Sequence, residues 1–276
     1  DNAGDWNIPR EFSPELNGRF HDGPATFNQD RTEIIYTRSA MRNEKKRLVN
    51  EENENQFQLY RSVKVDGVWQ EPTKLPFSSI NYSVGHPALS PDDQVLHFSS
   101  DMPGGFGGSD LYKSIRQGDS WSEPINLGST INTPGNEVFP YVSPDGKLYF
   151  SSEGHVTLGG LDVFVSEQQG DMWSKPKNLA YPLNSSRDDF GIYIEKGDTT
   201  GLVSSNRSGM DMIYTFAKIK PIFVLHGIAK QKADQLPMKD VKITLVNLTD
   251  GDTAIVRTPA DGKFSFNLLP NKKYKV

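Results

Sequence analysis

The sequence of 276 residues contains no cysteine, which excludes disulfides and thiolate metal sites. It has only five histidines, and none of them falls into the H-x-x-x-H or H-E-x-x-H spacing of zinc sites. It also lacks a G-x-S-x-G nucleophile elbow, a P-loop and any apolar run long enough to cross a membrane as a helix. These absences favour a non-enzymatic protein without catalytic residues, cofactor or metal ion.

Charge is distributed unevenly along the chain. Residues 221–276 carry nine Lys or Arg and five Asp but no Glu, which gives them a net charge of +4. The total charge of −5 leaves −9 for residues 1–220. Because nucleic-acid binding requires a clustered basic surface, we expect no nucleic-acid partner for this acidic part of the chain.

All four tryptophans occupy one slot of a repeated pattern, W-x-x-P-x-x-[L/F]. They are separated by 63, 52 and 52 residues, and an asparagine follows each copy. The tryptophans are Trp6, Trp69, Trp121 and Trp173, and the asparagines are Asn17, Asn81, Asn132 and Asn184. Short apolar strands, tight turns and glycine loops recur around them, most clearly between His86 and Gly128. Each copy predicts a small antiparallel sheet, which needs neighbours of its own kind to bury its faces.

The repeats predict an all-β fold in which residues 1–220 form a four-bladed β-propeller. The fourth copy stops after Phe216, without its tryptophan strand. A strand of that type is present at the other end of the chain, around Trp6, so residues 1–12 are expected to complete the last sheet and close the ring. The proline three residues after each tryptophan suits an outer strand, because proline is tolerated at sheet edges.

Residues 221–276 follow a different pattern. Apolar and polar residues alternate in four short stretches, which predicts the half-buried strands of a small β-sandwich. The chain stops at Val276 within an apparent strand, and a domain of about 55 residues is marginal on its own. We therefore expect the sequence to be a piece of a longer protein.

A polar insertion interrupts the first repeat at residues 39–56. It carries charged blocks at 42–47 and 51–55 and contains no glycine. Such blocks are typical of a solvated loop, and the alternative is an arm that binds a partner.

Several motifs resemble those of a known repeat family. The turn Ser143-Pro144-Asp145-Gly146, the Gly-Gly-x-Asp-Leu-Tyr stretch that ends at Tyr112 and the tryptophan pattern resemble the WD40-like (PD40) repeats of TolB-type propellers. The segment from His86 to Tyr112 matches best. The fourth repeat departs from the pattern, because Asp211 lies one residue further from its tyrosine than Asp110 does.

The C-terminal segment carries a second resemblance. Residues 225–227, Leu-His-Gly, and 261–266, Asp-Gly-Lys-Phe-Ser-Phe, resemble a carboxypeptidase-regulatory-like domain. A propeller followed by such a domain is similar to the central region of the PorE-type, OmpA-family component of the type IX secretion system. The resemblance implies a periplasmic, outer-membrane-associated scaffold that binds other envelope or secretion-system proteins. It also implies no membrane span in this stretch, and contact with peptidoglycan only through a flanking domain outside this sequence.

Topology indicates where such a scaffold would bind its partner. In a four-stranded antiparallel blade, the loops between the second and third strands share one face with the crossovers to the next blade, and binding residues concentrate on loops held by a rigid scaffold. The opposite face is expected to have only tight turns. The candidate protein-binding residues on the loop face are Arg19, His21, His86, Phe106, Glu137, His155, Arg187 and Asp188.

Several alternatives remain open from the sequence. Asp110 and Asp162 could hold calcium, although an Asp at a strand start ordinarily accepts hydrogen bonds from loop amides. The tryptophans could stack against a glycan, although strand-embedded aromatic residues ordinarily belong to the core. For the whole chain, the alternatives are an accessory propeller of a peptidase-like enzyme and a glycan- or peptidoglycan-binding propeller.

Overall fold

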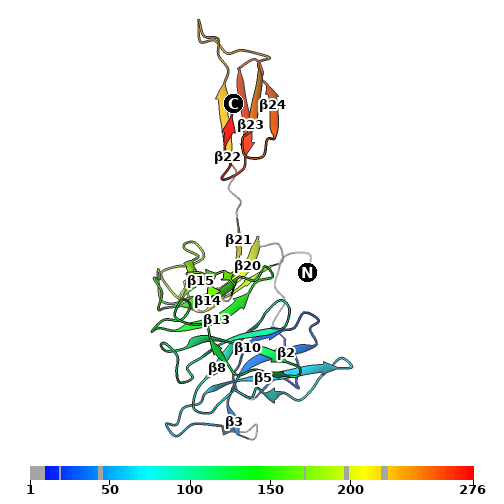
Figure 1. Ribbon diagram of the computed structural model, residues 1–276, viewed down its shortest axis with the longest axis vertical. Coiled ribbons are helices and arrows are strands. Elements are labelled where there is room, and N and C mark those ends of the chain that lie inside the picture. Colours follow the sequence, from blue (N-terminus) through cyan, green and yellow to red (C-terminus); the bar gives the residue numbers. More distant parts are fainter. Residues whose placement is uncertain (1–9, 19, 43–45, 171, 196–198, 219–222) are drawn as a thin grey trace. The chain divides into compact units, whose positions relative to one another are not determined.

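The computed structural model describes the chain apart from residues 1–9, 19, 43–45, 171, 196–198 and 219–222 (Figure 1). The described residues form strands, turns and loops without a helix, and none of them lies in a helical segment that could cross a membrane. The chain divides into two compact units between Ala217 and Lys218. The predicted all-β fold is confirmed.

Four antiparallel sheets follow one another along the first unit. The first sheet consists of β1 (Asp22–Phe27), β2 (Glu33–Ser39), β5 (Phe57–Val65), β6 (Val68–Trp69) and β7 (Thr73–Lys74). The second consists of β8 (Val84–Leu89), β9 (Val95–Ser100), β10 (Asp110–Gln117), β11 (Ser120–Trp121) and β12 (Ile125–Asn126).

The third and fourth sheets repeat this up-and-down order. The third sheet consists of β13 (Glu137–Val142), β14 (Leu148–Ser152), β15 (Asp162–Ser166) and β18 (Lys177–Asn178), beside the short pair β16 (Gln168–Gln169) and β17 (Met172–Trp173). The fourth consists of β19 (Asp189–Ile194), β20 (Thr200–Ser205) and β21 (Met212–Ala217).

The tryptophan strand of the first three sheets is divided into two short strands; Trp6 lies outside the described residues. In the second sheet, β11 and β12 both pair with β10, and Pro124 lies between them. Proline has no N–H to donate to the neighbouring strand, so the ladder is interrupted at this position. The proline therefore limits the outer edge of these three sheets to two-residue pairings.

Apolar side chains are buried between consecutive sheets. β1 packs against β8, β8 against β13, and β13 against β19. The layer between the first and second sheets includes Ile35, Leu59, Val84, Leu96 and Phe98, the next layer includes Leu111, Ile131, Leu148 and Phe150, and the last includes Tyr149, Val163, Ile192 and Val203. Trp69 and Trp121 are buried, as expected for core residues, whereas Trp173 is only half-buried.

A β-bulge recurs in the first strand of the sheets. The register of β8, β13 and β19 shifts at the same place in each repeat. The residues at these bulges, His86, Phe139 and Gly191, have positive φ angles of 52°, 51° and 60°. Positive φ is uncommon for residues other than glycine, so two of the three bulges impose a strained backbone on a large side chain.

The insertion in the first repeat contains a short antiparallel pair, β3 (Met41–Arg42) and β4 (Lys46–Arg47). The Asn55 side-chain amide donates hydrogen bonds to the carbonyls of Ala40 and Leu48, at 2.8 and 2.7 Å. These bonds tie the two ends of the hairpin to the residues that lead back into the first sheet.

The second unit consists of two small antiparallel sheets. The first pairs β22 (Phe223–Ile228) with β25 (Lys263–Leu268), and the second has the order β24 (Thr253–Arg257), β23 (Lys242–Asn247), β26 (Tyr274–Lys275). Leu245 and Phe266 are its best buried apolar residues, at 4% and 5% exposed.

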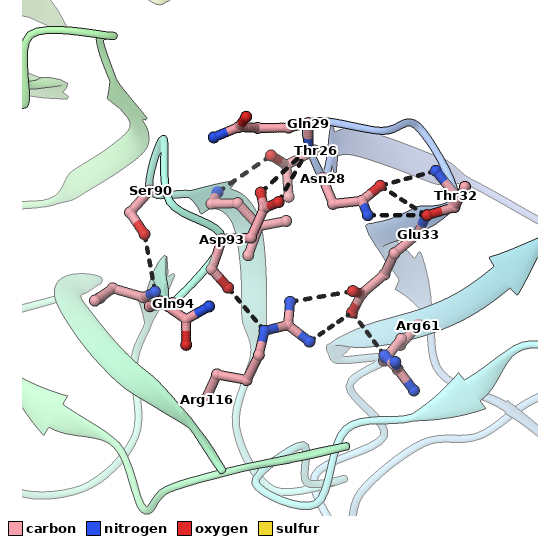
Figure 2. A network of polar contacts seen from close by, with 12 residues as sticks. Thr26, Asn28, Gln29, Thr32, Glu33, Arg61, Ser90, Asp93, Gln94 and Arg116 are labelled. Atoms are coloured by element: carbon pink, nitrogen blue, oxygen red, sulfur yellow. Dashed lines mark hydrogen bonds and ion pairs between the residues drawn. The ribbon is translucent and has the colours of Figure 1, made fainter. Parts of the chain in front are cut away.

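A polar network fills the groove between the first and second sheets near their hairpin turns (Figure 2). The Glu33 carboxylate lies 2.6 Å from Arg61 Nε and 3.1 Å from Arg116 Nη2. The Arg116 Nε donates to the Asp93 carbonyl at 2.7 Å, and its guanidinium lies 4.4 Å from the centre of the Trp121 ring. Arg116 thus connects the second sheet to the first.

The turns beside this network also contact one another. The Gln29 backbone N–H donates to the Asp93 carboxylate at 3.1 Å, and the Gln29 side chain donates to the Pro91 carbonyl. The Leu89 N–H donates to Thr26 Oγ1 at 3.1 Å. These bonds connect the first and second sheets.

We predict that Arg116→Ala lowers the free energy of unfolding by about 3 kcal/mol, because it leaves part of a buried carboxylate uncompensated. Arg257→Ala is the matched control, since its partner Asp240 is exposed, and it should change stability by less than about 1 kcal/mol. Urea denaturation of both variants measures the difference. Equal, small losses would show that the Glu33 network does not hold the two sheets together.

Candidate functional site

Glycine loops and crossovers meet at one face of the first unit. A Cβ at Gly107 would lie 2.3 Å from the Thr133 carbonyl oxygen, and one at Gly108 would lie 2.3 Å from the Asn136 side chain. The Gly108 N–H donates to the Gly135 carbonyl at 2.9 Å. The loop at 103–108 therefore needs glycine because the crossover at 133–136 passes directly against it.

The third sheet repeats this arrangement. A Cβ at Gly159 would lie 2.3 Å from the Arg187 carbonyl oxygen, and one at Gly160 would lie 2.1 Å from Asp188 Oδ1. The same Asp188 oxygen accepts the Leu161 N–H at 3.0 Å. We call the surface formed by the loops 103–108 and 154–160 and the crossovers 133–136 and 186–188 the loop face.

Two buried aspartates hold the loops of this face. Asp110 Oδ2 accepts hydrogen bonds from the Phe106 N–H at 2.6 Å and from the Asn126 amide at 2.8 Å. Asp162 Oδ2 accepts the corresponding bonds from Leu158 and Asn178, at 2.7 and 2.6 Å. These contacts are those expected of an Asp that accepts from loop amides at the start of a strand. Within the part of the chain that the structure describes, no three His, Asp or Glu residues gather as a metal site would require.

The repeated asparagine fixes the next segment. Asn132 Oδ1 accepts the Leu111 N–H at 2.8 Å, and its amide donates to the Leu111 carbonyl at 3.0 Å. Asn184 makes the equivalent bonds to Val163. In the first repeat Ser78 takes this role by accepting the Leu59 N–H, so the asparagine predicted there, Asn81, is not the equivalent residue.

Glu137 and His155, two of the predicted binding residues, are used inside the fold. Glu137 is 0% exposed and accepts hydrogen bonds from Thr133 and Ser152 at 2.6 to 2.7 Å. His155 Nε2 lies 2.8 Å from the Ile131 carbonyl, and its ring packs on aromatic neighbours of the third sheet. Both side chains hydrogen-bond to residues of the crossover between the second and third sheets and so hold it in place.

Asp188 has a similar internal role one repeat further on. It accepts from Leu161 and from the Asn206 amide, and its own N–H donates to Asn206 Oδ1 at 2.9 Å. Its carboxylate thus connects the loop of the third sheet to the fourth sheet.

His86 lies on β8 rather than on an exposed crossover. Its N–H donates to Thr37 Oγ1 at 2.9 Å, its Nδ1 lies 2.8 Å from Ser99 Oγ, and its ring stacks on Phe139 with 3.9 Å between centres. The Phe139 ring in turn lies 5.1 Å from that of Phe190. Burial lowers the pKa of His86 to about 4, so its ring is neutral near pH 7.

Three of the predicted binding residues are exposed. They are His21, Phe106 and Arg187, with the Phe106 side chain 49% exposed at the tip of its loop. Arg19 lies outside the described residues. Phe106 lies on a loop of the loop face, where its N–H donates to the buried Asp110. Arg187 lies on a crossover of the same face, where its N–H donates to Ser185 Oγ at 3.2 Å. A partner of this face would meet an apolar ring and a guanidinium.

The opposite face, where the hairpin turns lie, differs from the sequence-based expectation. The sequence predicts only tight turns there. The structure has a cavity of about 430 Å³ between the second and third sheets, lined by the turns Ser90–Asp92 and Pro144–Gly146, by His97 and by Trp173. Comparison of repeats would have revealed it, because the positions of Glu33 and Arg116 are occupied by Val95 and Gln168 one repeat further on.

Comparison with known proteins gives few sequence matches. No protein-family model matches this chain. A stretch of 162 residues is 26% identical to Colossin-A of Dictyostelium discoideum, covering 54% of this chain and 1% of that protein.

Among solved structures, a glycoside hydrolase has a TM-score of 0.50 at 10% identity, with 79% of this chain and 86% of that chain covered. A putative TolB of Agrobacterium tumefaciens has a TM-score of 0.46 at 13% identity, with 93% and 91% covered. A puromycin-hydrolyzing peptidase of Mycobacterium tuberculosis has a TM-score of 0.44 at 13% identity, and this chain spans 27% of its length. The strands themselves make the chain an all-β protein.

We predict that stability falls as the pH is lowered from about 6.5 towards about 4, because His86 has a lowered pKa in the folded chain. In this window the unfolded chain binds a proton that the folded chain does not, so the free energy of unfolding decreases, by up to about 3 kcal/mol for this group. The variant His86→Asn, which tolerates positive φ, should show a weaker pH dependence in urea denaturation. The exposed His21→Asn serves as control and should keep the original dependence; an unchanged slope in both variants would exclude His86 as the cause.

Proposed function

We propose that the first unit is a four-bladed β-propeller and that residues 1–12 complete its last blade. Two exposed apolar positions support this. Ile213 is 69% exposed, whereas its equivalents in the other three sheets, Leu59, Leu111 and Val163, are 0% exposed because the next sheet covers them.

The first sheet, at the other end of the four, also has an apolar side chain that no neighbouring sheet covers. Phe27 is 38% exposed, whereas its equivalents Leu89 and Val142 are 7% and 9% exposed. Phe12, the last residue of the proposed closing segment, packs on Phe27 and on Trp69, with ring centres 5.6 and 6.1 Å apart. Closure would bring the two uncovered apolar ends together and bury both.

Closure predicts the energetic effect of Ile213→Ala. In a closed ring this residue is buried, and the substitution should cost about 2–5 kcal/mol, as Leu111→Ala does at the equivalent position. If the ends stay apart, the change should lie within about 0.5 kcal/mol, the usual range for an exposed side chain. Urea denaturation of both variants, and of the chain without residues 1–12, measures this. A loss for Leu111→Ala alone would contradict closure.

We further propose that the chain is a non-enzymatic scaffold that binds a protein of the cell envelope through the loop face. The observation that carries this proposal is Phe106, an exposed aromatic residue on a loop whose base is held by the buried Asp110. Arg187 stands on the crossover between the third and fourth sheets. Aromatic residues and arginine on rigid supports are the side chains that dominate binding energy in protein interfaces.

The setting of this scaffold follows from the sequence resemblance. A propeller followed by a carboxypeptidase-regulatory-like domain fits a periplasmic, outer-membrane-associated component of a secretion assembly, such as type IX secretion. Its partners would then be other proteins of that assembly. No described group of side chains favours the alternative of a peptidase-like enzyme.

The loop face can be tested with paired variants. Phe106→Ala and Arg187→Glu should each weaken partner capture from envelope extracts by tenfold or more, since both remove an exposed anchor without touching a buried bond. Asp66→Lys and Asp119→Lys, on exposed hairpin turns at the opposite end, should capture the same partner as the unchanged chain. Equal capture by all four variants would exclude the loop face as the binding surface.

A further inference from the structure

The cavity between the second and third sheets lies apart from the loop face. It has a volume of about 430 Å³, within the range of about 300–1,000 Å³ typical of small-ligand sites. Its walls include Val95, His97 and Lys113 from the second sheet and Gln168 and Trp173 from the short β16–β17 pair. None of these residues takes part in the loop face.

Comparison of the repeats shows which side chains line this cavity. Glu33 and Val95 both lie three residues before the residue that pairs with the tyrosine of the third strand, and Arg116 and Gln168 both pair with the tryptophan of their own repeat. Glu33 and Arg116 meet between the first and second sheets (Figure 2). Val95 and Gln168 are shorter and uncharged, and both line the cavity between the second and third sheets.

A buried polar atom lies at the wall of this space. His97 is 5% exposed, and its Nδ1 has no hydrogen-bond partner among the described residues. Nδ1 can donate or accept a hydrogen bond, depending on which ring nitrogen carries the proton. Burial, with Lys113 nearby, lowers the pKa of His97 to about 4, which keeps the ring neutral.

The charges around the cavity restrict what it can bind. The carboxylates of Asp92 and Asp145, whose pKa values are lowered by hydrogen bonds in their turns, stand on the two turns that line it and disfavour anions. Lys113 in the wall disfavours cations. The polar Gln168 side chain in the wall favours a ligand that carries hydrogen-bonding groups over a purely apolar one.

The aromatic wall favours a ring-shaped ligand. Trp173 is half-buried, in contrast to the buried Trp69 and Trp121, and the His97 ring meets it edge-on with 6.3 Å between centres. A ligand with an apolar face and hydroxyl groups around its edge would cover the indole and hydrogen-bond with the Gln168 amide. We propose that this cavity binds a neutral sugar ring of a glycan. This goes beyond the protein-binding function proposed for the loop face and does not depend on it.

The repeat comparison supplies a variant that closes the cavity. The double substitution Val95→Glu and Gln168→Arg introduces the charged pair that fills the first groove. Because it copies a pairing that the same fold already accommodates, it should keep the melting temperature while removing the space for a ligand. The double substitution Val68→Glu and Gln70→Arg makes the same changes at exposed positions of the first sheet and is the matched control.

The probes are three neutral tetrasaccharides, those of N-acetylglucosamine, of α-1,4-linked glucose and of β-1,4-linked glucose. Binding is followed by tryptophan fluorescence and by the NMR signals of His97. We expect at least one probe to give a saturable change at millimolar concentration with the unchanged chain and the control, and a loss of tenfold or more in affinity with the closing variant. Absence of saturation by all three, or equal binding by a folded closing variant, would overturn the proposal.

Discussion

The structure depends on burial of apolar side chains between consecutive sheets. No sheet of the first unit forms a core alone; Phe98 and Phe150 are both fully buried only because a neighbouring sheet covers them. The buried polar contacts follow from the same constraint. Once two sheets pack, each crossover between them must pass close to a loop, and Asp110, Asn132 and Glu137 satisfy the backbone groups that this packing removes from water.

Much of this architecture could be predicted from the sequence, because it depends on residues that recur at regular spacing. The tryptophan slot located the outer strands, and the glycines before Asp110 and Asp162 marked the loops. The sequence did not indicate which of the candidate binding residues would be exposed. Glu137 and Phe106 are both loop-face residues in a topology diagram, yet one is 0% and the other 49% exposed. The difference arises from side-chain direction at a crossover, which no periodicity encodes.

The two grooves near the hairpin turns show how a repeat protein can diversify. Glu33 and Val95 hold equivalent register positions, as do Arg116 and Gln168, so the same fold carries different side chains at the two places. Glu33 and Arg116 give a cross-link between sheets, whereas Val95 and Gln168 give an opening beside an aromatic ring. The second and third sheets have no such cross-link at this place, and a continuous apolar layer packs between them.

The proline that divides the described tryptophan strands affects how copies of the chain can associate. An uninterrupted outer strand would present a row of free donors and acceptors, on which another molecule could add a strand of its own. With Pro124 between β11 and β12, the second sheet offers only two short ladders that are already paired with β10. The repeated motif therefore acts as protection against edge-to-edge aggregation, built into the same positions that hold the aromatic core.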